Sequence, residues 1–113
     1  MKAQFEIWLV TLNPARGTEP VKIRPAVVIQ SNLLNQLDHL STLICSITSW
    51  ISEEENILRV GLGAKETGLE QDSEILVDQI RALDNRRFSE KFGKLSLEKA
   101  LGLSEKLKAV KDF

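Results

Sequence analysis

The most β-prone stretch of the chain is Ile23-Arg24-Pro25-Ala26-Val27-Val28-Ile29-Gln30, which opens on an arginine and a proline. Proline cannot donate to a sheet ladder and fits the first position of a strand, so the pattern predicts a strand over Pro25–Gln30. The proline also biases Arg24 towards extended geometry. Arg24 therefore stands where a rigid strand meets the loop Asn13–Glu19, a setting in which functional side chains are often presented.

Alternating and β-branched apolar runs predict four more strands around this one. They cover Phe5–Leu12, Ser41–Ser49, Ile57–Leu62 and Ser73–Leu83. Both faces of the first of these strands are apolar. From Ser96 the apolar spacing becomes helical, and Ser96 is well suited as the N-cap. Five short strands followed by one helix indicate a mainly β single domain over residues 1–113, with a small, strongly bent sheet or barrel.

Composition indicates an ordinary folded domain, because 42% of the 113 residues are hydrophobic and 27% are charged. No secretory signal is recognised, and no apolar run approaches the roughly 20 residues that span a bilayer. A cytoplasmic location without membrane contact is expected. The one cysteine, Cys45, cannot form an internal disulfide and is expected to be a buried thiol.

The net charge of −1 hides an uneven distribution. Residues 1–80 carry 6 Lys/Arg against 11 Asp/Glu, a balance of −5, and residues 81–113 carry 9 against 5, a balance of +4. The basic side chains of the second part include the pair Arg86-Arg87. Such a cluster can bind nucleic acid or an acidic partner. It is also typical of a solvated turn, which is the simpler interpretation.

The available side chains exclude several classes of catalytic site. His39 is the only histidine, so any Ser-His-Asp or Cys-His catalytic arrangement would have to use it. One histidine and one cysteine are too few ligands for a zinc site. An enzyme built from this chain is expected to work with Arg, Thr, Ser, Glu and Gln, without metal or organic cofactor. Those groups suit RNA cleavage, because RNA supplies its own 2′-hydroxyl nucleophile and a fixed guanidinium stabilises charge on the phosphoryl oxygens.

With these groups in this order, the chain resembles the MazF/PemK (Kid) family of toxins from bacterial toxin–antitoxin pairs. The resemblance runs nearly end to end and rests on the order and spacing of several segments. They are Ile7-Trp8-Leu9-Val10, Leu12-Asn13-Pro14, Gly17-Thr18-Glu19, Arg24–Gln30, Ile47-Thr48-Ser49 and Leu76–Asp84.

The resemblance implies an SH3-like small β-barrel of the CcdB/MazF/PemK type, with a C-terminal helix, assembled as a homodimer. It further implies a metal-independent, sequence-specific endoribonuclease that cuts single-stranded RNA, with mRNA the expected substrate, by attack of the 2′-hydroxyl. A cognate antitoxin is the implied protein partner, which covers the groove at the dimer interface and blocks RNA.

The resemblance also assigns roles to individual residues. The catalytic positions of the family fall on Arg24 and Thr48, joined by Thr18 and Glu19 in the loop. Glu19 is a candidate general base, and His39 is a weaker one. The family's RNA-contacting glutamine falls on Gln79. Ser49, Arg81 and Trp50 complete the expected RNA-binding set. For Trp50, stacking on a base and packing against protein are equally open.

The chain departs from the family pattern in two places that bear on its structure. Phe5-Glu6 stands where the family usually has Gly-Asp, and Pro20–Ile23 replaces a stretch that is often glycine-containing. A stiffer, bulkier loop is expected to change which RNA sequences enter, or to reduce activity. Neither departure removes a proposed catalytic group.

Two alternatives to a ribonuclease remain open at this stage. One is a non-enzymatic poison of DNA gyrase on the same barrel, of the CcdB type, in which the C-terminal residues rather than Arg24 carry toxicity. The other is an inactive module that only binds an antitoxin or RNA. On residue type alone, Arg24 is more simply a solvated strand-end arginine, Thr48 a strand threonine and Gln79 an exposed polar residue.

Overall fold

One antiparallel sheet forms the body of the molecule in the computed structural model, which describes residues 2–13, 22–37, 40–52 and 57–111. Its strand order is β4-β5-β3-β2-β1-β6. The strands are β1 (Glu6–Asn13), β2 (Lys22–Val28), β3 (Ser41–Thr48), β4 (Arg59–Leu62), β5 (Ser73–Asp84) and β6 (Phe88–Lys94). The helices are α1 (Asn32–Asn35), α2 (Ala64–Thr67) and α3 (Leu97–Lys111), with the 3-10 turn η1 (Asn85–Arg87) between β5 and β6.

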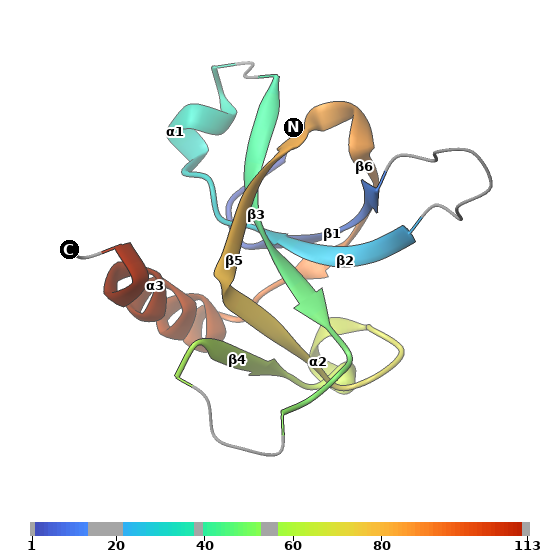
Figure 1. The fold of residues 1–113 in the computed structure, drawn as a ribbon, viewed down its shortest axis with the longest axis vertical. Helices are drawn as coiled ribbons and strands as arrows, with labels where there is room; N and C mark the ends of the chain where they lie inside the picture. The colour runs from blue at the N-terminus through green and yellow to red at the C-terminus, as the bar shows by residue number, and fades with distance from the viewer. Residues whose placement is uncertain (1, 14–21, 38–39, 53–56, 112–113) are drawn as a thin grey trace.

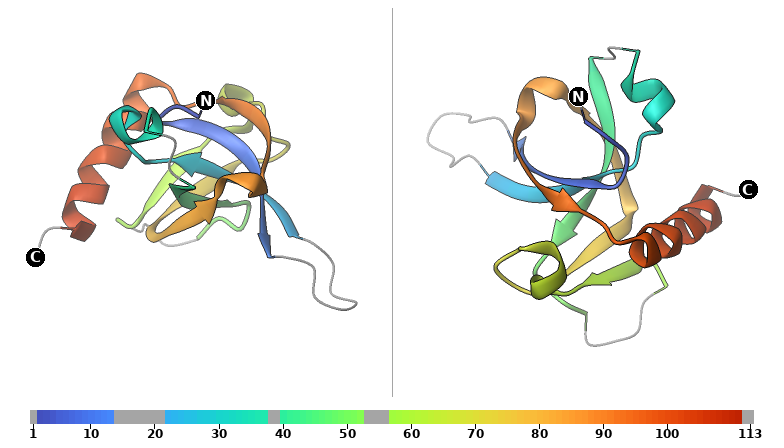
Figure 2. Two further views of the ribbon diagram at one scale, coloured as in Figure 1. Left: turned by 90° about the horizontal axis from the view of Figure 1, so that it is seen from above. Right: turned by 180° about the vertical axis from the view of Figure 1, so that it is seen from behind.

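The sheet bends strongly, so that β1 and β6 curl over one end while α3 lies beside β4 and β5 (Figures 1 and 2). The edge strands β4 and β6 stand at opposite ends of the strand order. The short helix α2 approaches β6 so closely that a Cβ atom on Gly93 would lie 3.3 Å from the carbonyl oxygen of Thr67. The expected fold class, mainly β with a C-terminal helix, is confirmed, and the barrel that it forms is an open one.

The expectation of five strands was wrong, because the segment expected to be a turn and helix entry contains a sixth, β6. Residues of β6 are mostly polar and exposed, so the segment lacks the alternation that marks a half-buried strand. What makes it a strand is its antiparallel pairing with β1, in which Leu9 lies opposite Glu90 and Val10 opposite Phe88.

The start predicted for the second strand was also wrong, because β2 begins at Lys22 rather than at Pro25. Pro25 pairs with Leu9 of β1, whereas the ladder between β2 and β3 starts only at Ala26. Pro25 therefore stands where β2 is still a free edge on its β3 side. A missing N–H costs no ladder hydrogen bond at such a position.

Apolar side chains pack into two clusters, and the first strand, apolar on both faces, contributes to each. Ile7 belongs to the larger cluster, together with Leu103 of α3, and Val10 belongs to the smaller one. Trp8 and Phe88 extend the smaller cluster with an edge-to-face contact, their ring centroids 6.0 Å apart. Cys45 is fully buried in the larger cluster, as expected.

The start of α3 follows the predicted cap. The Lys99 N–H donates to Ser96 Oγ at 3.3 Å, and the Ala100 N–H donates to the Ser96 carbonyl at 2.9 Å. Ala100 and Leu103 then face the larger cluster. No helix among the described residues has the length and apolar character needed to cross a membrane.

Candidate functional site

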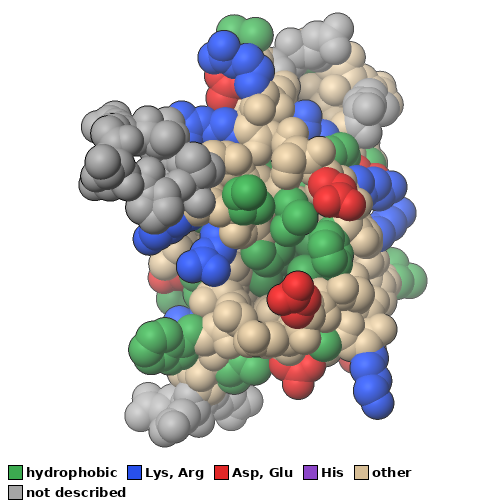
Figure 3. Space-filling view, turned by 90° about the vertical axis from the view of Figure 1, so that its right-hand side faces the viewer, with side chains coloured by type: hydrophobic (Ala, Val, Ile, Leu, Met, Phe, Trp, Pro, Cys, Tyr) green, Lys and Arg blue, Asp and Glu red, His purple; other side chains and the backbone are tan. Residues whose placement is uncertain are grey.

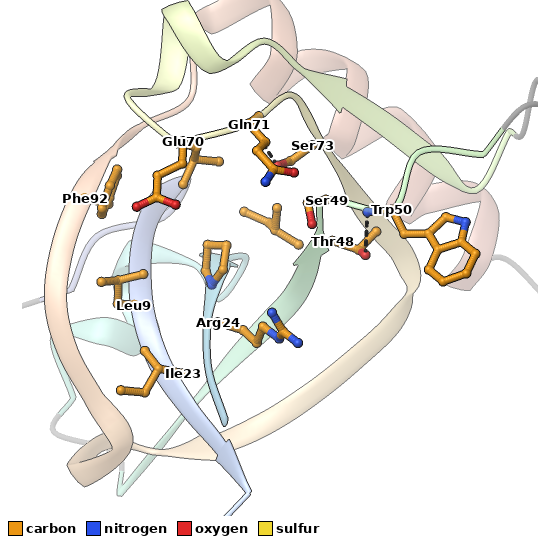
Figure 4. Close-up of a pocket in the computed structure, with 13 residues that line it drawn as sticks. Leu9, Ile23, Arg24, Thr48, Ser49, Trp50, Glu70, Gln71, Ser73 and Phe92 are labelled. Atoms are coloured by element: carbon orange, nitrogen blue, oxygen red, sulfur yellow. Dashed lines mark hydrogen bonds between the residues drawn. The ribbon is translucent and has the colours of Figure 1, made fainter. Parts of the chain in front are cut away.

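An open cleft of about 540 Å³ lies where the ends of β2 and β3 meet the connection between α2 and β5 (Figure 4). One part of its lining comes from the ends of the two strands and the residues after β3: Ile23, Arg24, Pro25, Ile47, Thr48, Ser49 and Trp50. The other part comes from β1, β6 and the segment before and at the start of β5: Leu9, Phe92, Leu69, Glu70, Gln71 and Ser73.

The register of the sheet explains why Arg24 and Thr48 line one cleft. Ala26 of β2 pairs with Ser46 of β3 at the end of their ladder, and Arg24 and Thr48 each lie two residues beyond that last pair. Side chains two residues apart on a strand share a face. The Arg24 side chain is exposed and extends towards β3 (Figure 4). No hydrogen bond or ion pair to a described residue engages its guanidinium, so its donors are available to an anion.

The chain turns sharply after Thr48 and presents Trp50 to solvent. Thr48 Oγ1 accepts a hydrogen bond from the Trp50 N–H at 3.1 Å, which leaves the hydroxyl proton free to be donated. The Trp50 side chain is 82% exposed. Packing of this indole within its own chain is thereby excluded.

A partly buried ion pair supports this turn from behind, and sequence reasoning missed it. Glu74 pairs with Thr48 in the β3–β5 ladder, accepts from the Ser52 N–H at 2.8 Å and lies 3.0 Å from Arg59 Nη1. Arg59 Nη1 also donates to the Trp50 carbonyl at 3.1 Å. Burial raises the pKa of Glu74, but the hydrogen bonds from Ser52 and Arg59 outweigh it and hold the pKa below its ordinary value. The residues are distant in sequence, so no local signal marks them.

The floor of the cleft is apolar, and a carboxylate stands on the wall across from Arg24. Leu9, Pro25 and Phe92 supply apolar surface, and Figure 3 shows hydrophobic side chains gathered in a hollow on this side of the molecule, with acidic groups at its border. Figure 4 shows the Glu70 carboxylate directed into the cleft above Leu9. Sequence reasoning missed both Glu70 and Phe92, which only the tertiary fold brings together.

The remaining predicted site residues lie elsewhere. Gln79 and Arg81 are exposed on β5 and are not among the residues that line the cleft. Arg81 Nη2 instead lies 3.5 Å from the Leu12 carbonyl oxygen, to which Arg87 Nη1 also donates at 3.3 Å. Thr18, Glu19 and His39 lie outside the described residues. No cluster of three or more potential metal ligands occurs within the described ranges.

Comparison with known proteins gives consistent matches over nearly the whole chain. Residues 3–110 match the family described as PemK-like, MazF-like toxin of type II toxin-antitoxin system. Endoribonuclease MazF of Staphylococcus epidermidis is 32% identical over 102 residues, which cover 90% of this chain and 84% of that protein.

Solved structures with similar folds are more distant in sequence. The Mycobacterium tuberculosis toxin MazF-mt6 superposes with a TM-score of 0.78 at 18% identity, covering 96% of this chain and 97% of its own. A MazE-MazF crystal structure (Form-II) from Deinococcus radiodurans gives a TM-score of 0.79 at 23% identity, with 96% and 94% covered. These likenesses concern the fold.

Proposed function

Because the chain belongs to the family of PemK-like, MazF-like toxins of type II toxin–antitoxin systems, we propose that it is an endoribonuclease that cuts single-stranded RNA in the cleft lined by Arg24 and Thr48. The observation that carries the proposal is that the uncommitted Arg24 guanidinium and the Thr48 hydroxyl line the same cleft, each at the end of a strand. Preorganised donors at the place where charge develops are the main source of such catalysis. The similarity to a protein named Endoribonuclease MazF supports this choice of chemistry.

The proposed reaction needs no group beyond the chain, its RNA and water. The RNA 2′-oxygen forms a bond to the adjacent phosphorus, and the bond from phosphorus to the 5′-oxygen breaks. The 2′-hydroxyl proton passes to the Glu19 carboxylate, and the leaving 5′-oxygen takes a proton from solvent water. The products are a 2′,3′-cyclic phosphate and a 5′-hydroxyl end. Neither a metal nor an organic cofactor takes part in this scheme.

Each proposed residue has a distinct role. Arg24 stabilises the negative charge on the phosphoryl oxygens, and the Thr48 hydroxyl donates a hydrogen bond to one of them. Glu19 in the loop takes up the 2′-hydroxyl proton, and the hydroxyl of Thr18 beside it donates a hydrogen bond to the phosphate. Ser49 and Trp50 hold the nucleotides next to the cut. Gln79 and Arg81 bind RNA further along the sheet.

The proposal extends to assembly and control. One of the similar structures is of MazE-MazF, and another is of a mycobacterial endoribonuclease in complex with its cognate antitoxin. We propose that this chain also binds a cognate antitoxin protein, which covers its cleft, that it forms a homodimer, and that it acts on mRNA in the cytoplasm. A segment that fills the cleft would exclude RNA by occupying the Arg24 donors.

The test is cleavage of a long unstructured RNA in EDTA by the purified protein, compared with Arg24→Ala and Arg86→Ala. Arg86 is a matched control because it is exposed and already paired with Asp84 at 2.9 Å. Wild type and Arg86→Ala are expected to give the same discrete fragments with 5′-hydroxyl ends, and Arg24→Ala none. Failure of the folded wild type on several RNAs would overturn the proposal and leave gyrase or simple binding as the function.

A further inference from the structure

The two walls of the cleft carry opposite charge. Arg24 stands on the wall formed by the ends of β2 and β3, and Glu70 stands on the other, in the segment that leads from α2 into β5. Glu70 is exposed, and neither a hydrogen bond nor an ion pair to a described residue engages its carboxylate. Figure 4 shows this carboxylate pointing into the open cleft, above Leu9.

An unpaired carboxylate in a cleft that binds RNA restricts, by its charge, how the RNA chain can lie there. It repels the phosphate backbone, which is attracted to the Arg24 side. The edge of the base, rather than the phosphate, is therefore the part of a nucleotide that can lie next to Glu70. A carboxylate is an acceptor only, so it favours bases that present an exocyclic amino group, namely adenine, cytosine and guanine. Uracil has no amino group, and its one N–H is flanked by two carbonyl oxygens that repel the carboxylate.

The surface between the two walls suits the face of a base. Leu9, Pro25 and Phe92 form an apolar floor below Glu70, and Phe92 retains 36% exposure, so its ring is accessible. Bases of single-stranded RNA bind commonly by stacking on such surfaces while their edges are read by hydrogen bonds. A base lying on this floor brings its edge to the Glu70 carboxylate.

We propose that Glu70 is a specificity-determining residue, which accepts a hydrogen bond from the exocyclic amino group of a base next to the cleaved phosphate and thereby discriminates against uracil at that position. The inference rests on the proposed ribonuclease function and deepens it. It gives the cleft a division of labour, in which Arg24 holds the phosphate and Glu70 reads an adjacent base.

The test compares wild type, Glu70→Gln and Glu105→Gln on a pool of random-sequence single-stranded RNA, with 5′-hydroxyl ends mapped by sequencing. Glu105 is the matched control because it is exposed on α3, outside the residues that line the cleft. Wild type and Glu105→Gln should show roughly tenfold depletion of uracil at one position beside the cut. Glu70→Gln should admit uracil there, because its amide can donate to a uracil carbonyl, while still cutting the pool.

A binding measurement separates failure of this inference from failure of the proposed function. Short 2′-fluoro RNA oligonucleotides, which lack the nucleophile, are titrated by fluorescence anisotropy with each base varied at each position. A preference for amino-bearing bases that Glu70→Gln loses would support the inference even if no cleavage occurs. Cleavage or binding with the same base preference in wild type and Glu70→Gln would overturn it, as would absence of RNA binding. Weaker antitoxin binding by Glu70→Gln with unchanged RNA preference would assign the carboxylate to the protein partner instead.

Discussion

Thr48 on β3 lies opposite Glu74 on β5, and the Glu74 carboxylate holds Ser52, four residues after Thr48, and Arg59 of β4. It accepts from the Ser52 N–H and from Arg59, whose guanidinium also contacts the Trp50 carbonyl. The proposed catalytic hydroxyl is therefore positioned by a charge network outside the cleft lining.

Glu74→Gln should destabilise the protein by about 1–2 kcal/mol, because it replaces charge-assisted hydrogen bonds at a partly buried site with neutral ones. The reduced rigidity around Thr48 should lower cleavage several-fold without abolishing it. Chemical denaturation and initial cleavage rates measure the two effects. Asp78→Asn, an exposed change on the same strand, is the control and should leave the stability near wild type. Equal stability of Glu74→Gln and wild type would show that the network does not hold the segment.

The same carboxylate gives a pH dependence of stability. Hydrogen bonds from Ser52 and Arg59 outweigh the effect of burial and lower the pKa of Glu74 from 4.5. A lowered pKa in the folded state means that the contribution to stability is fully present above pH 4.5 and is lost as the pH falls through the folded-state pKa. The stability difference between wild type and Glu74→Gln should therefore be constant near neutrality and shrink below pH 4.5. Thermal unfolding between pH 3 and pH 7 would measure it, and a difference independent of pH would contradict the argument.

Phe5 adopts a backbone conformation that suits glycine. Its φ of 70° lies in the left-handed region, and its backbone is held there by hydrogen bonds to the Val28 carbonyl at 2.7 Å and from the Leu95 N–H at 2.9 Å. Both Phe5→Ala and Phe5→Gly remove the ring, but only glycine relieves the strain. Phe5→Gly should therefore be more stable than Phe5→Ala by about 1 kcal/mol.

The opposite order is expected at Gly102 on α3, which serves as the control. No atom lies within 4 Å of a Cβ built at that position, so alanine fits without a clash. Gly102→Ala should raise the stability by about 1 kcal/mol through helix propensity alone. Denaturant titration of wild type and the three variants measures these differences in the free energy of unfolding. If Phe5→Ala were the more stable of the two Phe5 variants, the backbone at Phe5 would not be strained.

The strands that contribute side chains to the apolar clusters could be predicted from the sequence. A strand that depends on pairing with a distant segment could not. β1 and β3 carry residues of both clusters, so their apolar or β-branched character is visible locally. β6 has a polar, exposed sequence and exists as a strand because it pairs with β1.

The same distinction holds for the cleft. Arg24 and Thr48 could be identified because each stands in a family motif. Glu70 and Phe92 lie 22 positions apart and come from different elements. Their common position follows from the packing of α2 against β6, which no sequence pattern encodes.

Trp50 should contribute to RNA affinity and not to the stability of the monomer. Its side chain is 82% exposed beside the cleft, and stacking on one base is worth about 1–3 kcal/mol. Trp50→Ala should therefore weaken binding of a 2′-fluoro RNA by about 5- to 150-fold, with an unchanged melting temperature. Trp50→Phe should retain most of the affinity. A loss of dimer in Trp50→Ala, measured by light scattering, with unaltered RNA binding, would assign the indole to protein contact instead.

Arg81 and Arg87 should bind the RNA backbone together, although they lie outside the cleft lining. Both guanidinium groups point to the Leu12 carbonyl oxygen, at 3.5 Å and 3.3 Å, and neither has a carboxylate within ion-pair distance among the described residues. Two cations that converge on one neutral oxygen repel each other, and a bound phosphate would relieve that repulsion. Arg81→Ala and Arg87→Ala should each weaken RNA binding and reduce the slope of log affinity against log salt by about 0.7.

Arg86 provides the comparison for this last prediction, because it is adjacent to Arg87 and already neutralised. Its Nε and Nη2 atoms bind the two oxygens of Asp84 at 3.1 Å and 2.9 Å, and these contacts lower the pKa of Asp84 to about 2. An arginine committed to a carboxylate releases few counterions when RNA binds. Arg86→Ala should therefore change the salt slope much less than Arg87→Ala. Equal slopes for Arg86→Ala and Arg87→Ala would mean that Arg81 and Arg87 do not form a phosphate site. The basic segment would then act only through its net charge.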